Sequence, residues 1–134
     1  MNLKKVIGLA VTTLALNMSI MGDVYAGIDV KCEVRGTSRS KASVDGRSLA
    51  NAKYIASVKS GAAAAKFSKN SKRPVAGEVE FDFDSNPADV NAGATAIPAT
   101  FIKNHSVLGK IYRLNANGTK TEVSHELNDA CKAK

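Results

Sequence analysis

The clearest alternation of hydrophobic and polar residues lies in the segment GEVEFDFDSNPADVNAGATAIP, residues 77–98. In its first half hydrophobic positions alternate with acidic ones, Val79, Phe81 and Phe83 against Glu78, Glu80, Asp82 and Asp84. Successive side chains of a strand point to opposite faces, so this half predicts a strand with one buried and one exposed face. Half of the chain's 4 phenylalanines lie here, and we therefore expect this strand at the centre of the core.

Four further segments predict strands. Residues 107–114 are strongly apolar, whereas residues 28–35, 53–59 and 119–127 alternate in the same way. In the last segment Val123, His125 and Leu127 share one predicted face, opposite Glu122, Ser124 and Glu126. A histidine on an apolar face usually belongs to the core, so His125 is expected to be a hydrogen-bonded core residue.

Two segments have a weaker pattern. Residues 61–73 contain four consecutive alanines, which favour a helix, but the segment is short and opens with glycine. It therefore predicts an edge strand or a loop. Residues 99–102 follow Pro98 and are expected to be extended.

Short motifs mark turns between these segments. Asp45-Gly46 and Asn117-Gly118 suit turns that need a positive φ, and Asn117-Gly118 is placed to close a hairpin between two predicted strands. Pro87 is expected to begin one helical turn, with Ser85 or Asn86 as its N-cap.

Together these features predict an all-β fold, because about seven short strands alternate with turn-rich connections and no long amphipathic helix is present. We expect an antiparallel β-sandwich, immunoglobulin-like in architecture, with a small β-barrel as the alternative. The chain contains no tryptophan, and its cysteines lie near its ends, so kinship with antibody domains is not predicted.

The N-terminal residues 1–26 are expected to be a cleaved signal peptide. A short basic segment precedes the apolar run VIGLAVTTLALNMSIM, and Val24-Tyr25-Ala26 fits a leader-peptidase site. A membrane anchor is the alternative, but the run is short and no basic cluster follows it. Residues 27–134 are then expected to form a single β-rich domain, located in the periplasm or outside the cell.

Cys32 and Cys131 are the chain's 2 cysteines. In an exported protein an even pair of cysteines predicts a disulfide. Cys32 falls on the apolar side of the alternation in residues 28–35, so its sulfur should point inward. No C-x-x-C motif is present, and a redox role is not predicted.

The formal net charge is +7 at pH 7, and the excess is uneven. Residues 31–73 hold eleven lysines and arginines against Glu33 and Asp45, whereas residues 74–134 hold six against eight acids. A basic first half can attract anionic partners such as lipid headgroups, acidic polysaccharide or nucleic acid. No motif specific for nucleic acid is present, so the expected partner is an anionic component of the cell envelope or another exported protein. The alternative is that these side chains only occupy solvated strand faces. The candidate anion-binding residues are Lys66, Lys69, Lys72 and Arg73.

The aperiodic half of the first segment, residues 84–98, is the leading candidate for recognition, because loops on a rigid sandwich usually carry it. The candidate binding residues are Asp84, Asn86, Asp89, Asn91 and Thr95. Asp82, Asp84 and Asp89 with Asn86 also suggest a calcium site. However, Pro87 stands where an EF-hand loop requires glycine. The alternative is an acidic strand edge followed by a capped turn, and no metal or cofactor is predicted.

No motif in the sequence points to an enzyme. Ser38 and Lys41 match the S-x-x-K pattern of penicillin-recognising enzymes, but the accompanying motifs are absent. His105 and His125, the chain's 2 histidines, lack the spacing of zinc ligands. The alternative function is a small secreted hydrolase that uses one of these histidines beside a serine and an acid.

The phrase FDFDSNPADVNAGATAIPATFI, residues 81–102, resembles small exported proteobacterial proteins of unknown function. The stretch VDGRSLA at residues 44–50 and the two cysteines fit the same group. The resemblance implies export and a β-rich fold, and it brings no activity, cofactor or catalytic residue. The leading hypothesis is therefore a non-enzymatic binding or structural protein of the periplasm or cell surface.

Overall fold

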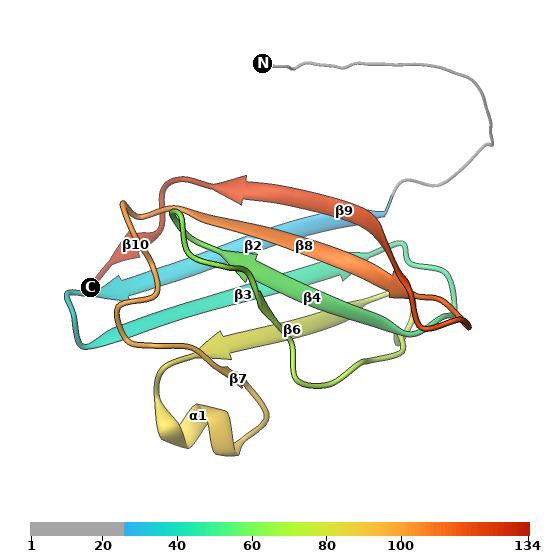
Figure 1. The fold of residues 1–134 in the computed structure, drawn as a ribbon, viewed down its shortest axis with the longest axis horizontal. Coiled ribbons are helices and arrows are strands. Elements are labelled where there is room, and N and C mark those ends of the chain that lie inside the picture. The colour runs from blue at the N-terminus through green and yellow to red at the C-terminus, as the bar shows by residue number, and fades with distance from the viewer. Residues whose placement is uncertain (1–25) are drawn as a thin grey trace.

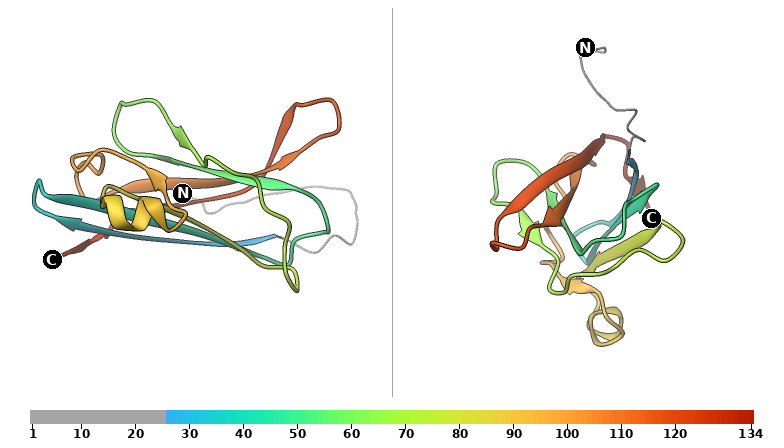
Figure 2. Two further views of the ribbon diagram at one scale, coloured as in Figure 1. Left: turned by 90° about the horizontal axis from the view of Figure 1, so that it is seen from below. Right: turned by 90° about the vertical axis from the view of Figure 1, so that its right-hand side faces the viewer.

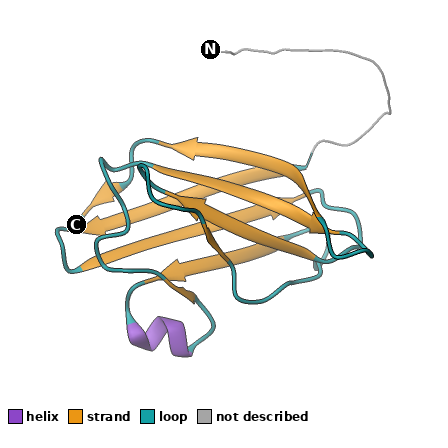
Figure 3. Ribbon diagram, viewed as in Figure 1, coloured by secondary structure: helices purple, strands orange, loops and turns teal. Residues whose placement is uncertain are grey.

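Two β-sheets pack face to face in the computed structural model, which describes residues 26–134 (Figure 1). The five-stranded sheet has the order β10-β2-β3-β6-β7, and the four-stranded sheet has the order β5-β4-β8-β9. Figure 3 shows that strands dominate and that the helix is short. The predicted all-β sandwich is confirmed, and the sheets do not close into the alternative barrel. The predicted signal peptide, residues 1–26, lies outside the described residues except for Ala26.

The strands of the five-stranded sheet are β2 (Gly27–Arg35), β3 (Arg39–Arg47), β6 (Val79–Asp84), β7 (Thr95–Ala96) and β10 (Lys132–Ala133). β2, β3 and β6 are antiparallel neighbours, whereas the two-residue strands β7 and β10 join its edges in parallel. The four-stranded sheet contains β4 (Tyr54–Lys59), β5 (Lys66–Phe67), β8 (Val107–Leu114) and β9 (Lys120–Asn128), all antiparallel. The helix α1 (Pro87–Asn91) projects from the edge beyond β6 (Figure 2).

The core lies between the two sheets, and β6 supplies its largest side chains. Phe81 and Phe83 are 2% and 0% exposed, and Val79 lies on the same face. This confirms the predicted inward face of the strand. Its other face departs from the prediction at one position, because Asp84 is buried at 1% exposure.

The prediction of a turn at Asp45-Gly46 is wrong, because both residues lie inside β3. A Cβ at Gly46 would lie 2.6 Å from Ile111 Cδ1, so glycine is needed there for close packing of the opposite sheet. The turn lies before β3 instead, where Gly36 has a φ of 52°. The alternation within β3 was hidden because its inward residues are small: Ser40, Ala42, Val44 and Gly46.

The expected extended segment at residues 99–102 is also wrong. A turn forms there, in which the Phe101 N–H donates to the Pro98 carbonyl at 3.0 Å. Other local predictions are confirmed: β5 is an edge strand within residues 61–73, and α1 begins at Pro87 with Asn86 as its N-cap. Asn117-Gly118 lies in the β8–β9 hairpin, with Gly118 at a φ of 86°.

The β8–β9 pairing changes register at Val123, which is an extra residue on β9. Such a bulge moves the residues that follow it to the opposite face of the strand. His125 and Leu127 consequently point to solvent, and Leu127 is 58% exposed. The prediction that His125 lies in the core is therefore wrong. The residues that turn toward the five-stranded sheet instead are Ser124, Glu126 and Asn128.

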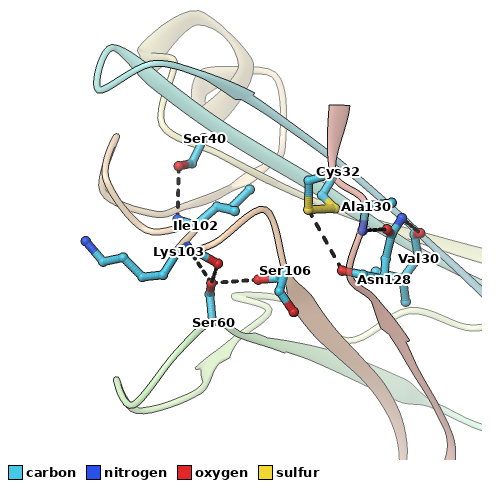
Figure 4. The surroundings of a disulfide bond; sticks show 10 residues. Val30, Cys32, Ser40, Ser60, Ile102, Lys103, Ser106, Asn128 and Ala130 are labelled. Carbon is cyan, nitrogen blue, oxygen red and sulfur yellow. Dashed lines mark hydrogen bonds between the residues drawn. A yellow bond between two sulfur atoms is a disulfide. The ribbon is translucent and has the colours of Figure 1, made fainter. Parts of the chain in front are cut away.

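These inward polar side chains cover the open edge of β2. The Val30 N–H donates to Glu126 Oε1 at 3.0 Å. Asn128 Nδ2 donates to the Val30 carbonyl at 2.7 Å (Figure 4). The side chains of Glu126 and Asn128 thus bond the β2 backbone groups that a neighbouring strand would otherwise pair with. An edge covered in this way is less able to pair with another chain.

The connection from β7 to β8 closes one end of the sandwich, and two buried serines hold it (Figure 4). Ser40 Oγ accepts the N–H of Ile102 at 3.2 Å, and Ser60 Oγ accepts the N–H of Lys103 at 2.7 Å. Ser40 lies on β3 and Ser60 directly follows β4. The connection is therefore bonded to both sheets.

The predicted disulfide between Cys32 and Cys131 is confirmed. It joins β2 to the C-terminal tail across a sequence separation of 99, and both cysteines contribute to the core. The Cys131 N–H also donates to the His105 carbonyl at 3.0 Å. The tail is thereby fixed beside the closed end of the sandwich.

Candidate functional site

The predicted binding loop is anchored to the five-stranded sheet by Arg39 of β3. Its guanidinium donates to both carboxylate oxygens of Asp84, at 3.0 and 2.6 Å, and to Asp89 Oδ2 at 2.9 Å. The Asn86 N–H donates to Asp84 Oδ1 at 3.0 Å. One arginine therefore joins the end of β6 to α1, and a two-pronged contact of this kind fixes geometry as well as charge.

The environment of Asp84 lowers the pKa of its carboxyl below the ordinary value of 3.8. Burial acts most strongly and in the opposite direction, because it disfavours the charged form. The hydrogen bonds from the Arg39 side chain and the Asn86 backbone, together with the positive charges of Arg39 and Lys41, outweigh it. Asp84 is thus a buried carboxylate that folding keeps ionised.

Asp84→Asn is expected to destabilise the protein by about 2 kcal/mol at neutral pH, because it removes a hydrogen bond between charged groups. A lowered folded-state pKa contributes stability above the unfolded pKa, and this contribution is lost as the pH falls through the folded value. The difference in melting temperature between parent and variant should therefore be full at pH 7 and shrink below about pH 4. A difference that is constant across this range would contradict the ionised pair.

The other candidate residues of the loop mostly have internal partners. The Asn86 side chain accepts the N–H of Ala88 as the helix cap, and Thr95, only 5% exposed, accepts the N–H of Lys69 at 2.9 Å. Asn91 is exposed at the end of α1. Binding by this set stays a prediction, and the contacts give most of its members a structural role.

The carboxylates considered for calcium do not converge around an empty centre. Arg39 forms salt bridges with Asp84 and Asp89, so its guanidinium occupies the position that a calcium ion would need. Asp82 lies on the exposed face of β6. Within residues 26–134, no group of three or more histidine, cysteine or acidic side chains is arranged to hold a metal ion.

The four candidate anion-binding residues do not share one surface. Lys69 Nζ donates to the Val90 carbonyl at 3.2 Å, and Lys72 Nζ donates to the Glu80 carbonyl at 2.6 Å. Both ammonium groups therefore turn toward β6 and α1. Arg73 reaches Asn51 at 3.4 Å, and Lys66 lies exposed on the edge strand β5.

The two histidines also lie apart from any catalytic arrangement. His125 Nδ1 lies 2.7 Å from Glu122 Oε2 on the exposed face of β9. His105 is exposed in the connection before β8 and has a φ of 54°. In the described part of the chain, neither histidine makes a side-chain hydrogen bond to a serine. The hydrolase hypothesis therefore has no supporting contact there.

A shallow groove crosses the outer face of the five-stranded sheet, and sequence reasoning missed it. It consists of two adjoining hollows of about 370 and 320 Å³ that share Lys41, Glu80 and Asp82. We call this the sheet-face groove. One wall is the C-terminal segment 128–132, and the other is the end of α1 with residues 92–94. The volumes lie at the lower end of the range for small-molecule pockets.

Charges of both signs line the sheet-face groove, and Glu33, which Arg35 bonds at 3.1 Å, lies between Lys41 and Lys132 in the strand register. The lysines Lys41 and Lys132 make no salt bridge within residues 26–134, and neither do the acids Glu80 and Asp82. Lys132 lies on the β10 side and the two acids on β6. Repulsion from Asp82 is the largest cause that raises the pKa of Glu80, and partial burial adds to it. A positive ligand group beside these acids would relieve that repulsion.

Neither the protein-family models nor the curated proteins match the chain. Among solved structures, it aligns with catalytically inactive OgpA from Akkermansia muciniphila in complex with an O-glycopeptide (glycodrosocin) substrate. The identity is 13%, the alignment covers 82% of this chain and 31% of that chain, and the TM-score is 0.35. The chain thus spans less than a third of that protein, and this likeness carries no argument about function.

Proposed function

We propose that this protein is an exported, non-enzymatic binding protein whose ligand occupies the sheet-face groove. The proposal rests on one observation. The C-terminal segment and the end of α1 stand on either side of a strand face on which Lys41, Glu80 and Asp82 have no salt-bridge partner within residues 26–134. Export is supported by the disulfide, which persists in oxidising compartments. No helix within residues 26–134 is long and apolar enough to cross a membrane.

The walls themselves are fixed, which favours binding. The disulfide holds the C-terminal wall against β2, and Arg39 holds α1 against β6. Groups held rigidly lose little freedom when a ligand binds, and this lowers the cost of association. The predicted recognition loop thus contributes a wall of the groove rather than the whole site.

Charges of both signs without a salt-bridge partner favour a polar ligand that carries an anionic and a cationic group, such as a short peptide with free termini. Its carboxylate would lie near Lys41 and Lys132, and its ammonium group near Glu80 and Asp82. Such charged hydrogen bonds give specificity and orientation in an open groove.

The test is a titration of the protein with the tripeptide alanyl-lysyl-alanine, followed by NMR through the backbone amides. We expect shifts along the groove residues of β3, β6 and the C-terminal segment. The double variant Glu80→Gln, Asp82→Asn should weaken binding at least about fivefold, since it removes two charged contacts. Asp29→Asn is the matched control, because Asp29 lies on the same sheet face outside the groove.

Two results would contradict the proposal. One is equal shifts with trialanine blocked at both termini, which would show that charge does not matter. The other is an equal loss of binding in Asp29→Asn, which would show that the groove is not the site.

A further inference from the structure

The outer face of the four-stranded sheet carries a set of large apolar side chains, and no other element within residues 26–134 covers it. Tyr54, Ala56 and Val58 of β4 point inward, so the residues between them point outward. The strand register then places the following apolar side chains on the outer face: Ile55, Phe67, Leu108, Tyr112, Leu114 and Leu127. An antiparallel sheet usually exposes polar residues on its solvent side. We call this surface the apolar sheet face.

The exposed side chains concentrate on this face. The described residues contain three large hydrophobic side chains that are exposed, namely Phe67 at 41%, Leu127 at 58% and Val75 at 80%. Phe67 and Leu127 lie on the apolar sheet face, whereas Val75 lies in the turn before β6. Exposed apolar surface that gathers on one face marks a site of interaction.

The four-stranded sheet also carries an excess of positive charge, to which lysines and an arginine from both halves of the chain contribute. In the five-stranded sheet, acids on β2, β3 and β6 balance the bases of neighbouring strands. The strands of the four-stranded sheet hold Lys59, Lys66, Lys110, Arg113 and Lys120 against Glu122 and Glu126. Among the strands, the excess of positive charge therefore lies on this layer of the sandwich.

Both acids of this layer are already occupied. The Glu122 carboxylate contacts Lys110 Nζ at 3.0 Å and His125 Nδ1 at 2.7 Å. The Glu126 carboxylate accepts a hydrogen bond from the Val30 N–H on the inner side of the sheet. Lys59 and Lys120 are left to border the apolar sheet face. Lys120 Nζ lies 5.2 Å from the centre of the Phe67 ring, so an ammonium group sits directly beside exposed hydrocarbon.

We propose that the apolar sheet face docks on the surface of an anionic phospholipid membrane. Lysines would contact the lipid phosphates while the leucines and Phe67 enter the boundary with the acyl chains. Aliphatic side chains favour a lipid over a polysaccharide or nucleic acid, because those polymers require hydrogen-bonding groups or open aromatic faces. Lys120 lies over Phe67, which leaves that ring less open for stacking.

The experiment measures co-sedimentation of the protein, purified as the cell processes it, with two kinds of vesicle. One kind is pure phosphatidylcholine, and the other contains equal parts of phosphatidylcholine and phosphatidylglycerol. We expect binding to the anionic vesicles alone. It should weaken steeply as salt rises, because charge screening shortens to about 8 Å at physiological ionic strength.

Matched variants identify the face. Leu127→Ser should weaken vesicle binding about fivefold, and Lys120→Glu about tenfold, because the latter changes the charge by two units. Val75→Ser and Lys134→Glu are the controls, since they make the same chemical changes on an exposed residue elsewhere. Thermal melts of all four variants confirm that each is folded.

The proposal is overturned if Leu127→Ser binds as tightly as Val75→Ser, or if neutral and anionic vesicles bind equally well. It is also overturned if heparin binds the protein and displaces it from vesicles while Leu127→Ser binds heparin and vesicles like the parent. That result would assign the surface to an anionic polymer. Because the sheet-face groove lies on the other sheet, its peptide titration fails or succeeds independently.

Discussion

Replacing both Cys32 and Cys131 by serine is expected to lower the free energy of unfolding by about 4 to 5 kcal/mol. The disulfide closes a loop with a sequence separation of 99, and a crosslink that long removes much of the conformational freedom of the unfolded chain. Urea unfolding of the oxidised parent and of the double variant measures this difference. A protein of this size has a total stability of roughly 5 to 15 kcal/mol, so the disulfide accounts for about a quarter of it or more.

The same experiment distinguishes chain entropy from local contacts of the tail. Reduction of the parent should reproduce most of the loss, whereas a reductant should leave the double variant unchanged. The short strand β10 and the Cys131–His105 hydrogen bond are then held only by their own contacts. Amide exchange at Val34, whose carbonyl accepts the Lys134 N–H beside β10, should accelerate. Free thiols in the native parent, detected by alkylation and intact mass, would contradict the prediction.

The sequence predicted those strands whose inward residues are large. β6 presents a bulky hydrophobic side chain to the core at every second position, and this contrast with its polar neighbours is easy to detect. β4 and β8 each present two large inward side chains, although Ala56 and Gly109 stand between them. β3 has the same period but small inward residues, so composition concealed it. Gly46 is small because Ile111 of the opposite sheet needs the space, and that requirement belongs to packing rather than to the local sequence.

The faces of β9 show a second reason why sequence alone could not predict every side-chain orientation. Its alternation is visible, yet one extra residue at Val123 exchanges its faces halfway along the strand. Whether a bulge forms depends on the partner strand and on what each face then meets. Here the exchange brings Glu126 and Asn128 to the unpaired backbone of β2. The polar side chains of β9 that were expected to face solvent therefore cover the open edge of β2.

The candidate site was predicted in part for a similar reason. The acids of residues 82–89 were recognised, but their partner Arg39 lies more than forty positions earlier and on a strand that was not predicted. The lysines of residues 66–73 were recognised as a basic group, although contacts with β6 and α1 direct two of them away from the others. Neither pairing has a signal in the local sequence.

The two proposals are compatible because they use opposite faces of the sandwich. If the apolar sheet face lies on a membrane, the sheet-face groove points away from it and stays open to ligands. The charge distribution supports this orientation, since the excess of lysine lies on the four-stranded layer. The acids Glu80 and Asp82 would then face away from the negative lipid surface.

The second large effect is expected in the core, where Phe83→Ala and Phe81→Ala should each cost about 3 to 5 kcal/mol. Phe83 is fully buried and Phe81 nearly so, and each removed ring leaves a cavity that the neighbouring strands cannot fill without moving. The two costs should be similar, because both rings are buried and the Phe81 ring also has the ammonium group of Lys72 5.4 Å from its centre. Thermal and urea unfolding of both variants measures the cost.

Phe67→Ala and Asp82→Ala are the matched controls. Phe67 has the same chemistry but is 41% exposed on the edge strand β5, so its removal should cost less than about half as much. Asp82 lies on β6 between the two phenylalanines and points to solvent, where substitutions usually change stability by less than about 0.5 kcal/mol. A cost for Asp82→Ala equal to that of Phe83→Ala would mean that the faces of β6 are assigned wrongly. The groove on its outer side would then lose its basis, because the same alternation that buries Phe81 and Phe83 exposes Glu80 and Asp82.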